Sequence, residues 1–225
     1  LKEIHKRLFK DVLRKVPVGS FRKYNITKQE WVLDGDTVFY SDFNLIQDTL
    51  DYDFNAERNF DYSKLSKDEF VKHFTRFVAN LWQVHAIGEG NTRTTAVFTI
   101  KYLGTLGYDV TNEVFEDNSW YFRNSLARAN YTNAKKDIYM NTEYLEKFFR
   151  NLILGEKNEL KNRYCHVRYS EITENTATVN ATVKLSKSQK QILEEVAKNS
   201  FVTQEELAEI IGIHVVNIKK NMKKP

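Results

Sequence analysis

Residues that break helices are scarce in this chain of 225 residues, which contains only 2 prolines and 8 glycines. Because proline and glycine interrupt regular structure, their scarcity predicts a mainly helical protein. The single cysteine, Cys165, excludes an intramolecular disulfide and a multi-cysteine zinc site, and it is typical of a reducing compartment. No apolar run approaches the roughly 20 residues that cross a bilayer, and no signal peptide is visible. We therefore expect a cytoplasmic protein without a membrane partner.

An excess of one charge sign is also lacking. The 34 basic and 30 acidic residues leave a net charge of +4, which is too small to define a nucleic-acid-binding protein by itself. Any basic patch therefore has to be local. The hydrophobic fraction of 41% suits a globular chain and argues against disorder.

Helical spacing of apolar residues predicts a compact bundle. Apolar side chains recur at i, i+3 and i+4 in the segments 1–16, 43–53, 67–84, 94–106, 118–131 and 141–154. The segment 52–66 is polar and predicts a loop. One β-hairpin is expected from Trp31 to Tyr40, because two β-rich arms flank Asp34-Gly35-Asp36 and Asp-Gly favours a tight turn.

The loop from His85 to Arg93 combines residues that suit a phosphate group. Its glycines let backbone N–H groups approach an anion, and the following helix presents the positive end of its dipole. Arg93 can clamp phosphate oxygens, Glu89 can hold Mg²⁺, and His85 can accept a proton from a hydroxyl group. The loop thus predicts transfer of a nucleotidyl or phosphoryl group.

A simpler interpretation of the same residues stays open. His85 alone is most simply a helix-end histidine, and Asn91 alone is a helix N-cap. Glu89 and Arg93, four positions apart, would then form a surface ion pair. The loop is not a Walker loop, because it lacks the Gly-Lys-Ser/Thr ending.

The loop sequence His-Ala-Ile-Gly-Glu-Gly-Asn-Thr-Arg resembles the signature of the Fic (Fic/Doc) family. That signature begins His-Pro-Phe, continues with an acid before Gly-Asn, and ends in two arginines three positions apart. The resemblance extends over about residues 1–168, including Gly19-Ser-Phe-Arg22 and the segment 119–131. It implies a Fic-fold helical bundle in which the hairpin 31–40 serves as a flap beside the site.

The resemblance also implies an activity. Family members typically transfer AMP from ATP, with Mg²⁺, to a Ser, Thr or Tyr hydroxyl group of a target protein. His85 would be the general base and Glu89 the Mg²⁺ ligand. The residues expected to bind phosphate are Gly88, Gly90, Asn91, Thr92 and Arg93. The flap residues expected to align the target by β-augmentation are Val32, Leu33, Thr37, Val38 and Phe39. A homodimer is left open.

One departure from the signature concerns the phosphate site. Ala96 stands where the second signature arginine is expected, which in the family orients the γ-phosphate and pairs with an inhibitory glutamate. Arg123 or Arg128, from another helix, could replace it. Two alternative functions therefore stay open: a Doc-like phosphotransferase, and a DNA-binding regulator whose Fic core senses a nucleotide.

Residues 169–187 are rich in Thr, Asn and Ser and predict a linker between a Fic domain at 1–168 and a second domain at 188–225. Within it, Ser170 and Glu174 match a short inhibitory pattern of the family. Because helix propensity is poor there and Ala96 removes the partner of Glu174, we favour a plain linker. Cys165 and His166, just before it, are expected to be packing residues rather than metal ligands.

The segment 188–225 predicts three short helices, the second opened by a capping box of Thr203 and Glu206. It resembles the helix-turn-helix of winged-helix domains, so duplex DNA is an expected partner; the β-wing is absent, and we expect a fragment cut before it. The residues expected to face DNA are His214, Asn217, Lys219, Lys220, Lys223 and Lys224. The alternative is a helical accessory domain with a solvated basic face.

Overall fold

A computed structural model describes residues 1–14, 16–169, 186–198 and 202–222. The chain divides into two compact units, Leu1–Tyr169 and Ser170–Pro225, and each is described by itself. In the described ranges the regular structure is helical, and strand pairing is limited to two isolated antiparallel bridges, Gln29–Thr37 and Asn133–Ile138. The prediction of a mainly helical protein is confirmed. Within the same ranges, no helix has both the length and the apolar character needed to cross a membrane.

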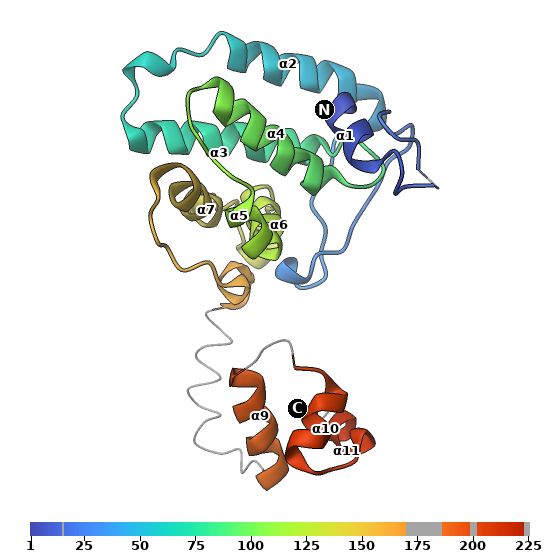
Figure 1. Ribbon diagram of the computed structural model, residues 1–225. Helices are drawn as coiled ribbons and strands as arrows, with labels where there is room; N and C mark the ends of the chain where they lie inside the picture. Colours follow the sequence, from blue (N-terminus) through green and yellow to red (C-terminus); the bar gives the residue numbers. More distant parts are fainter. Residues whose placement is uncertain (15, 170–185, 199–201, 223–225) are drawn as a thin grey trace. The chain divides into compact units, whose positions relative to one another are not determined.

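The first unit is built around one long helix. Its α-helices are α1 (Lys2–Phe9), α2 (Ile46–Arg58), α3 (Lys67–Val84), α4 (Asn91–Thr105), α5 (Glu113–Asp117), α6 (Ser119–Ala129) and α7 (Glu143–Leu154). Short 3₁₀ helices join them: η1 (Trp31–Leu33), η2 (Phe43–Leu45), η3 (Tyr62–Lys64), η4 (Ala134–Lys136) and η5 (Asn162–Cys165). Helix α3 packs against α2, α4, α6 and α7, while α1 lies against α4 (Figure 1).

The bounds of α3 follow from its sequence. The Ser66 hydroxyl accepts the Glu69 N–H, and the Glu69 carboxylate accepts the Ser66 N–H, so both ends of a capping box are present. Along the helix, a continuous apolar face that includes Phe70, Phe74 and Trp82 is buried. The helix begins and ends where its spacing predicts.

Aromatic rings fill the core between α3, α6 and α7. Phe74, Phe122, Phe148 and Phe149 are fully buried. The ring centroids of Phe122 and Phe148 are 4.9 Å apart, and those of Phe74 and Phe149 are 5.2 Å apart. Such tilted and edge contacts add to the area that burial removes from water. This core fixes α6 beside α3, and both helices carry residues of the site described below.

The prediction of a loop at 52–66 is wrong in part, because α2 continues to Arg58. The reason is a buried carboxylate. Glu57 is 5% exposed and accepts hydrogen bonds from the hydroxyl groups of Tyr62 and Tyr102, while the His73 Nε2 lies 2.8 Å away from it. Burial and Glu57 raise the pKa of Tyr62, which stays protonated. The helix is therefore stabilised by polar contacts that an apolar pattern does not reveal.

The predicted hairpin at Trp31–Tyr40 is also wrong in its conformation. The first arm is the 3₁₀ helix η1, which ends at Asp34 in the left-handed region with φ 58°. Adjacent residues of a strand point to opposite faces, yet Val32 and Leu33 are both 0% exposed. Burying both in the core against α6 and η5 favours a helical turn over a strand. The chain still reverses here, with a single bridge between Gln29 and Thr37.

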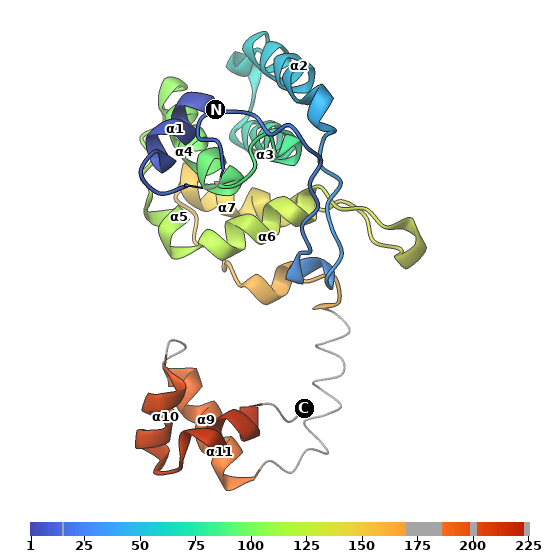
Figure 2. The same ribbon diagram turned by 90° about the vertical axis from the view of Figure 1, so that its right-hand side faces the viewer.

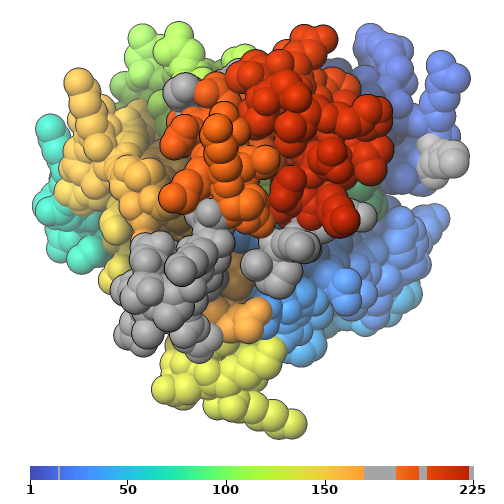
Figure 3. Space-filling model, turned by 90° about the horizontal axis from the view of Figure 1, so that it is seen from below, coloured from blue at the N-terminus to red at the C-terminus, as the bar shows by residue number. Residues whose placement is uncertain are grey.

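A second reversal joins α6 to α7. Residues 130–142 project from the end of α6 in Figure 2 and stand out in yellow in Figure 3. Near the base of this loop, Asp36 accepts hydrogen bonds from the Tyr131 hydroxyl at 2.7 Å and from the Asn133 amide at 3.3 Å. These bonds tie the loop to the turn at Asp34–Asp36.

The described part of the second unit contains α9 (Lys187–Lys198), α10 (Gln204–Ile211) and α11 (Val215–Met222). They enclose a small core whose buried members are Ile192, Leu207, Ala208 and Ile218. Thr203 and Glu206 form the predicted capping box, and Gly212 turns the chain with φ 71°. The three helices are confirmed, and the winged-helix type stays a prediction.

The ring cluster makes a testable contribution to stability. We expect Phe148→Ala to lower the free energy of unfolding by about 3–5 kcal/mol, because it leaves a cavity in a fully buried site. All 3 tryptophans (Trp31, Trp82 and Trp120) lie in the first unit, so tryptophan fluorescence in urea reports on this unit alone. Tyr139→Ala, at a site 59% exposed, is the control and should change stability by less than about 0.5 kcal/mol. Equal losses in both variants would contradict the expectation.

Candidate functional site

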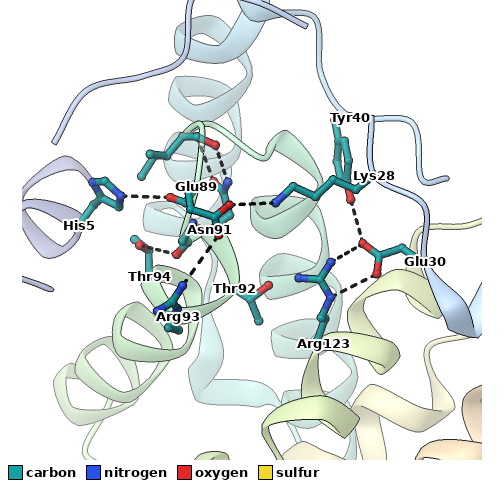
Figure 4. Close-up of polar contacts among 12 residues, drawn as sticks. His5, Lys28, Glu30, Tyr40, Glu89, Asn91, Thr92, Arg93, Thr94 and Arg123 are labelled. Atoms are coloured by element: carbon teal, nitrogen blue, oxygen red, sulfur yellow. Dashed lines mark hydrogen bonds and ion pairs between the residues drawn. The ribbon is translucent and has the colours of Figure 1, made fainter. Parts of the chain in front are cut away.

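The loop between α3 and α4 is closed by the side chain of Asn91. Its Oδ1 accepts the Ile87 N–H at 3.0 Å, and its Nδ2 donates to the Ile87 carbonyl (Figure 4). Asn91 is 7% exposed. Both ends of the amide are thus bonded within the loop, so the Asn91 side chain shapes the loop.

Helix α1 anchors the same loop through His5. The His5 Nδ1 accepts the Gly19 N–H at 2.9 Å, so the proton of the neutral ring lies on Nε2. That Nε2 donates to the Glu89 carbonyl at 3.1 Å. Burial, which is the largest cause, and the charge of Arg93 lower the pKa of His5 and favour this neutral form.

Close packing requires a glycine at position 90 of the loop. A Cβ on Gly90 would lie 2.6 Å from Cε2 of Phe9, and Gly90 has φ 80°. A Cβ on Gly88 would lie 2.7 Å from the Tyr24 hydroxyl. Gly90 also lines the cavity described below, whereas Gly88 lines a different one with Tyr24. Of the two predicted phosphate-binding glycines, Gly90 is therefore the one that lines this cavity.

His85 follows the last residue of α3 in the left-handed region, with φ 48°. Arg22 is the anchor of this helix end: it is 5% exposed, and its Nε donates to the His85 carbonyl at 2.8 Å. The His85 Nδ1 lies 3.3 Å from the Trp82 carbonyl, which can only accept, so Nδ1 carries the proton. The His85 Nε2 is left as a buried acceptor with no hydrogen-bond partner among the described residues.

The ring of His85 is covered. Tyr40 stacks on the ring with a centroid distance of 4.0 Å, and His85 is only 1% exposed. Burial is the largest cause that lowers the pKa of His85 to about 3, followed by the positive charge of Lys28, with smaller effects of Arg123 and Arg22. The imidazole is therefore neutral at physiological pH.

A small cavity lies beside His85 at the N-terminus of α4. Its volume is about 60 Å³, and it is lined by Lys28, His85, Glu89, Gly90, Asn91, Thr92, Arg93 and Arg123. The first N–H groups of α4 have no helical carbonyl partner, and three side-chain cations surround them (Figure 4). The arrangement suits an anion the size of a phosphate group.

Glu89 contributes the carboxylate of this cavity. It lies 3.9 Å from the Lys28 ammonium and 3.8 Å from the Arg93 guanidinium, and its side chain is 46% exposed. The expected Glu89–Arg93 ion pair is present, but both of these distances are long. No cluster of three or more His, Cys, Asp or Glu side chains suited to a metal occurs among the described residues.

The outer side of α4 faces a larger cavity of about 470 Å³, between α1, α4, α5 and α6. It shares Thr92 and Arg93 with the small cavity, and Ala96 lines it. The Thr92 hydroxyl accepts a hydrogen bond from the Trp82 indole at 3.0 Å. Ala96, which stands at the position of the second signature arginine, therefore lines this mostly apolar cavity and supplies no cation.

The side chains of the expected docking residues of the flap do not form one surface. Val32, Leu33 and Val38 are core residues, at most 1% exposed, so their side chains cannot contact a target chain. The Thr37 hydroxyl accepts the Lys28 N–H and donates to the Val38 carbonyl. Only Phe39 presents its side chain, which is 81% exposed.

Other predicted residues lie away from the loop. Cys165 is buried and His166 packs on Trp31 with a centroid distance of 4.8 Å, as expected for packing residues. The candidate inhibitory residues Ser170 and Glu174 lie outside the described residues. On the second unit His214, Asn217, Lys219 and Lys220 are exposed, whereas Lys223 and Lys224 lie outside the described residues.

Comparison with known proteins supports a family for part of the chain. Residues 1–103 match the family model described as the Fic/DOC family, a region that runs from α1 to α4 and includes the loop. No curated protein matches the chain. Among solved structures, the chain is similar to the N-terminal FIC domain of a VirB-translocated effector protein from Bartonella sp. 1-1C. The identity is 21%, the TM-score is 0.47, and the match covers 68% of this chain and 70% of that one.

The cover over His85 predicts an unusual titration. Because its pKa is lowered to about 3 from 6.5, we expect its ring NMR shifts to stay constant between pH 8 and pH 5. The unfolded chain binds the proton more readily, so stability due to His85 is complete above pH 6.5 and falls as the pH drops. Tyr40→Ala, which uncovers the ring, should move the titration up toward 6.5. A wild-type titration near 6.5 would contradict the burial of this ring.

Proposed function

We propose that the protein is a Fic-type transferase that moves AMP from ATP to a hydroxyl side chain of a target protein in a reducing cytoplasm. One observation carries the proposal. A histidine whose Nε2 is an unpartnered acceptor lies beside a phosphate-sized cavity at a helix N-terminus. The Fic/DOC match of residues 1–103, which contain the whole loop, supports it.

The chain's own groups fit the transfer step. The target oxygen attacks the α-phosphorus, the bond from that phosphorus to the bridging oxygen breaks, and pyrophosphate leaves. His85 Nε2 takes the hydroxyl proton, because the other ring nitrogen already donates toward Trp82. The N–H groups at the start of α4 and the Arg93 guanidinium hold phosphate oxygens. Phosphate charge beside Lys28 and Arg123 would offset the cations that contribute to the low pKa of His85.

Glu89 is suited to bind the Mg²⁺ that this chemistry uses. It is a half-exposed carboxylate on the cavity wall, held by two long ion pairs and by the Gly90 N–H at 3.1 Å. Mg²⁺ commonly takes one or two carboxylates together with phosphate oxygens and water. When bound, the ion neutralises phosphate charge. Lys28 and Arg93 are then free to turn toward the nucleotide.

Access to His85 depends on the target. The His85 Nε2 is buried and Tyr40 covers a face of the ring, so no hydroxyl group reaches Nε2 in this conformation. We therefore expect the target side chain to replace the Tyr40 ring over His85. The exposed Phe39, next to it in sequence, is a candidate contact for the target.

Labelled nucleotides separate the candidate reactions. Incubation of the protein with Mg²⁺, a cell lysate and ATP labelled at the α or the γ position should give protein label from the α position only. Label from γ alone would indicate a Doc-like phosphotransferase, and no label would indicate a nucleotide sensor.

His85→Ala should reduce transfer by about 10²–10⁴-fold, as expected for a lost general base. Unchanged transfer by His85→Ala would exclude the proposed base. Calorimetry should show that Glu89→Ala weakens only the Mg²⁺-dependent binding of ATP.

A second function is favoured by the charges of the second unit. Helix α11 presents Lys219 and Lys220 to solvent and carries no acid, whereas α10 carries Glu205, Glu206 and Glu209. Among the three described helices of this unit, α11 thus carries the largest net positive charge. We propose that this helix contacts the phosphates of duplex DNA.

Salt dependence tests this contact. Each phosphate contact contributes a slope of about −0.9 to the plot of log affinity against log salt. Changing both Lys219 and Lys220 to Ala should flatten the slope by about two if both contact phosphate. Changing the exposed Lys187 and Lys190 of α9 to Ala is the matched control and should leave the slope unchanged. Equal slopes for all three proteins would exclude α11 as the contact, and no binding at low salt would make the unit an accessory domain.

A further inference from the structure

Arg123 is part of the loop cavity although it comes from a different helix. It lies in the second turn of α6, and it lines the small cavity with Thr92, Arg93 and Lys28. Arg128, the other candidate to replace the missing arginine, is five residues further and so on another face of the helix. Arg128 is buried and does not line the cavity. Of the two, the fold brings only Arg123 to the site.

Arg123 is held by one end of its guanidinium. Its Nε donates to the Glu30 carboxylate at 3.2 Å and its Nη2 at 2.7 Å. Figure 4 shows the third nitrogen on the side of Thr92, away from Glu30. A guanidinium has five N–H donors, so donors remain for an anion in the cavity without breaking the pair.

Glu30 is itself fixed in place. Its side chain is 5% exposed, and the Tyr40 hydroxyl lies 3.5 Å from its Oε1. Its N–H donates to the Asp36 carbonyl, and its own carbonyl accepts the N–H groups of Leu33 and Gly35. A buried, immobile carboxylate is expensive without a cation, so Arg123 stays in this orientation.

The charge of the ligand requires a further cation. ATP carries several negative charges on consecutive phosphates, and Ala96 contributes none of the charge expected at its position. Among the residues of α4, Arg93 is the one cation that lines the cavity. Arg123 approaches from the opposite wall of the same cavity. Fork-shaped pairing of guanidinium with phosphate is the strongest polar contact that this wall can offer.

We propose that Arg123 is the second phosphate-binding residue of the site, oriented by Glu30, and that it replaces the arginine missing at position 96. This inference rests on the proposed function, since it assumes a nucleotide phosphate in the cavity. It makes Glu30 a positioning residue and Arg123 a ligand contact. The anion that it predicts is the phosphate chain of a nucleoside di- or triphosphate.

Calorimetry with ATP and with inorganic pyrophosphate, with and without MgCl₂, tests the proposal on the full chain. Arg123→Gln should weaken binding of both ligands by about tenfold or more, as for a lost hydrogen bond to a charged group. Glu30→Gln removes the negative charge of the pair but keeps the cation and an amide oxygen that can still accept from Arg123, so it should stay within about threefold of the wild type. Arg150→Gln, which removes a guanidinium paired with Asp68 and Glu156 outside the cavity, is the control and should bind normally.

The outcomes separate this inference from the proposed function. Equal losses in Arg123→Gln and Glu30→Gln would show that only the ion pair matters and would overturn the inference, as would normal binding by Arg123→Gln. In either case, loss of binding in Arg93→Gln would leave the proposed function standing. If the wild type binds neither ligand, both fail. Thermal unfolding of each variant establishes that the first unit is folded.

Discussion

The hydrogen bonds between the Asn91 side chain and the backbone of Ile87 are the constraint on which the site depends. They close the loop so that α4 begins directly after a sharp turn, with its free N–H groups next to His85. His5 holds the same loop from α1, and Arg22 holds the end of α3. Because buried polar groups need partners, each of these side chains fixes a backbone segment that would otherwise be free to move.

Much of the helical frame could be predicted from local signals. The apolar spacing at i, i+3 and i+4 predicts helix α3 at its observed bounds. The end of α7 was marked by Gly155, which takes φ 66° after the last helical residue. The loop was visible because its glycines, acid and arginine are contiguous in sequence. In each case the residues that determine the element lie within it or next to it.

The rest of the site could not be predicted in this way, because it is assembled from distant segments. Lys28, Tyr40 and Glu30 come from the chain between α1 and α2, and Arg123 comes from α6. No periodicity links them to the loop. The hairpin prediction failed for a related reason: Trp31 and Val32 have β propensity, but the core against α6 accepts the side chains of Val32 and Leu33 together from a 3₁₀ turn. Tertiary packing overrode the local preference.

The ring of Tyr40 over His85 sets the kind of motion that opens the site. The backbone on both sides of Tyr40 is anchored, because Gln83 donates to the Phe39 carbonyl at 3.1 Å and Arg22 donates to the Ser41 carbonyl. Opening is thus a rotation about the side-chain bonds of one residue, while the surrounding loop stays in place. Tyr40 is only partly exposed, because its ring also meets Trp82 edge-on and its hydroxyl group lies 3.5 Å from the Glu30 carboxylate. Its rotation therefore breaks these contacts together with the stacking on His85, while the backbone keeps its place.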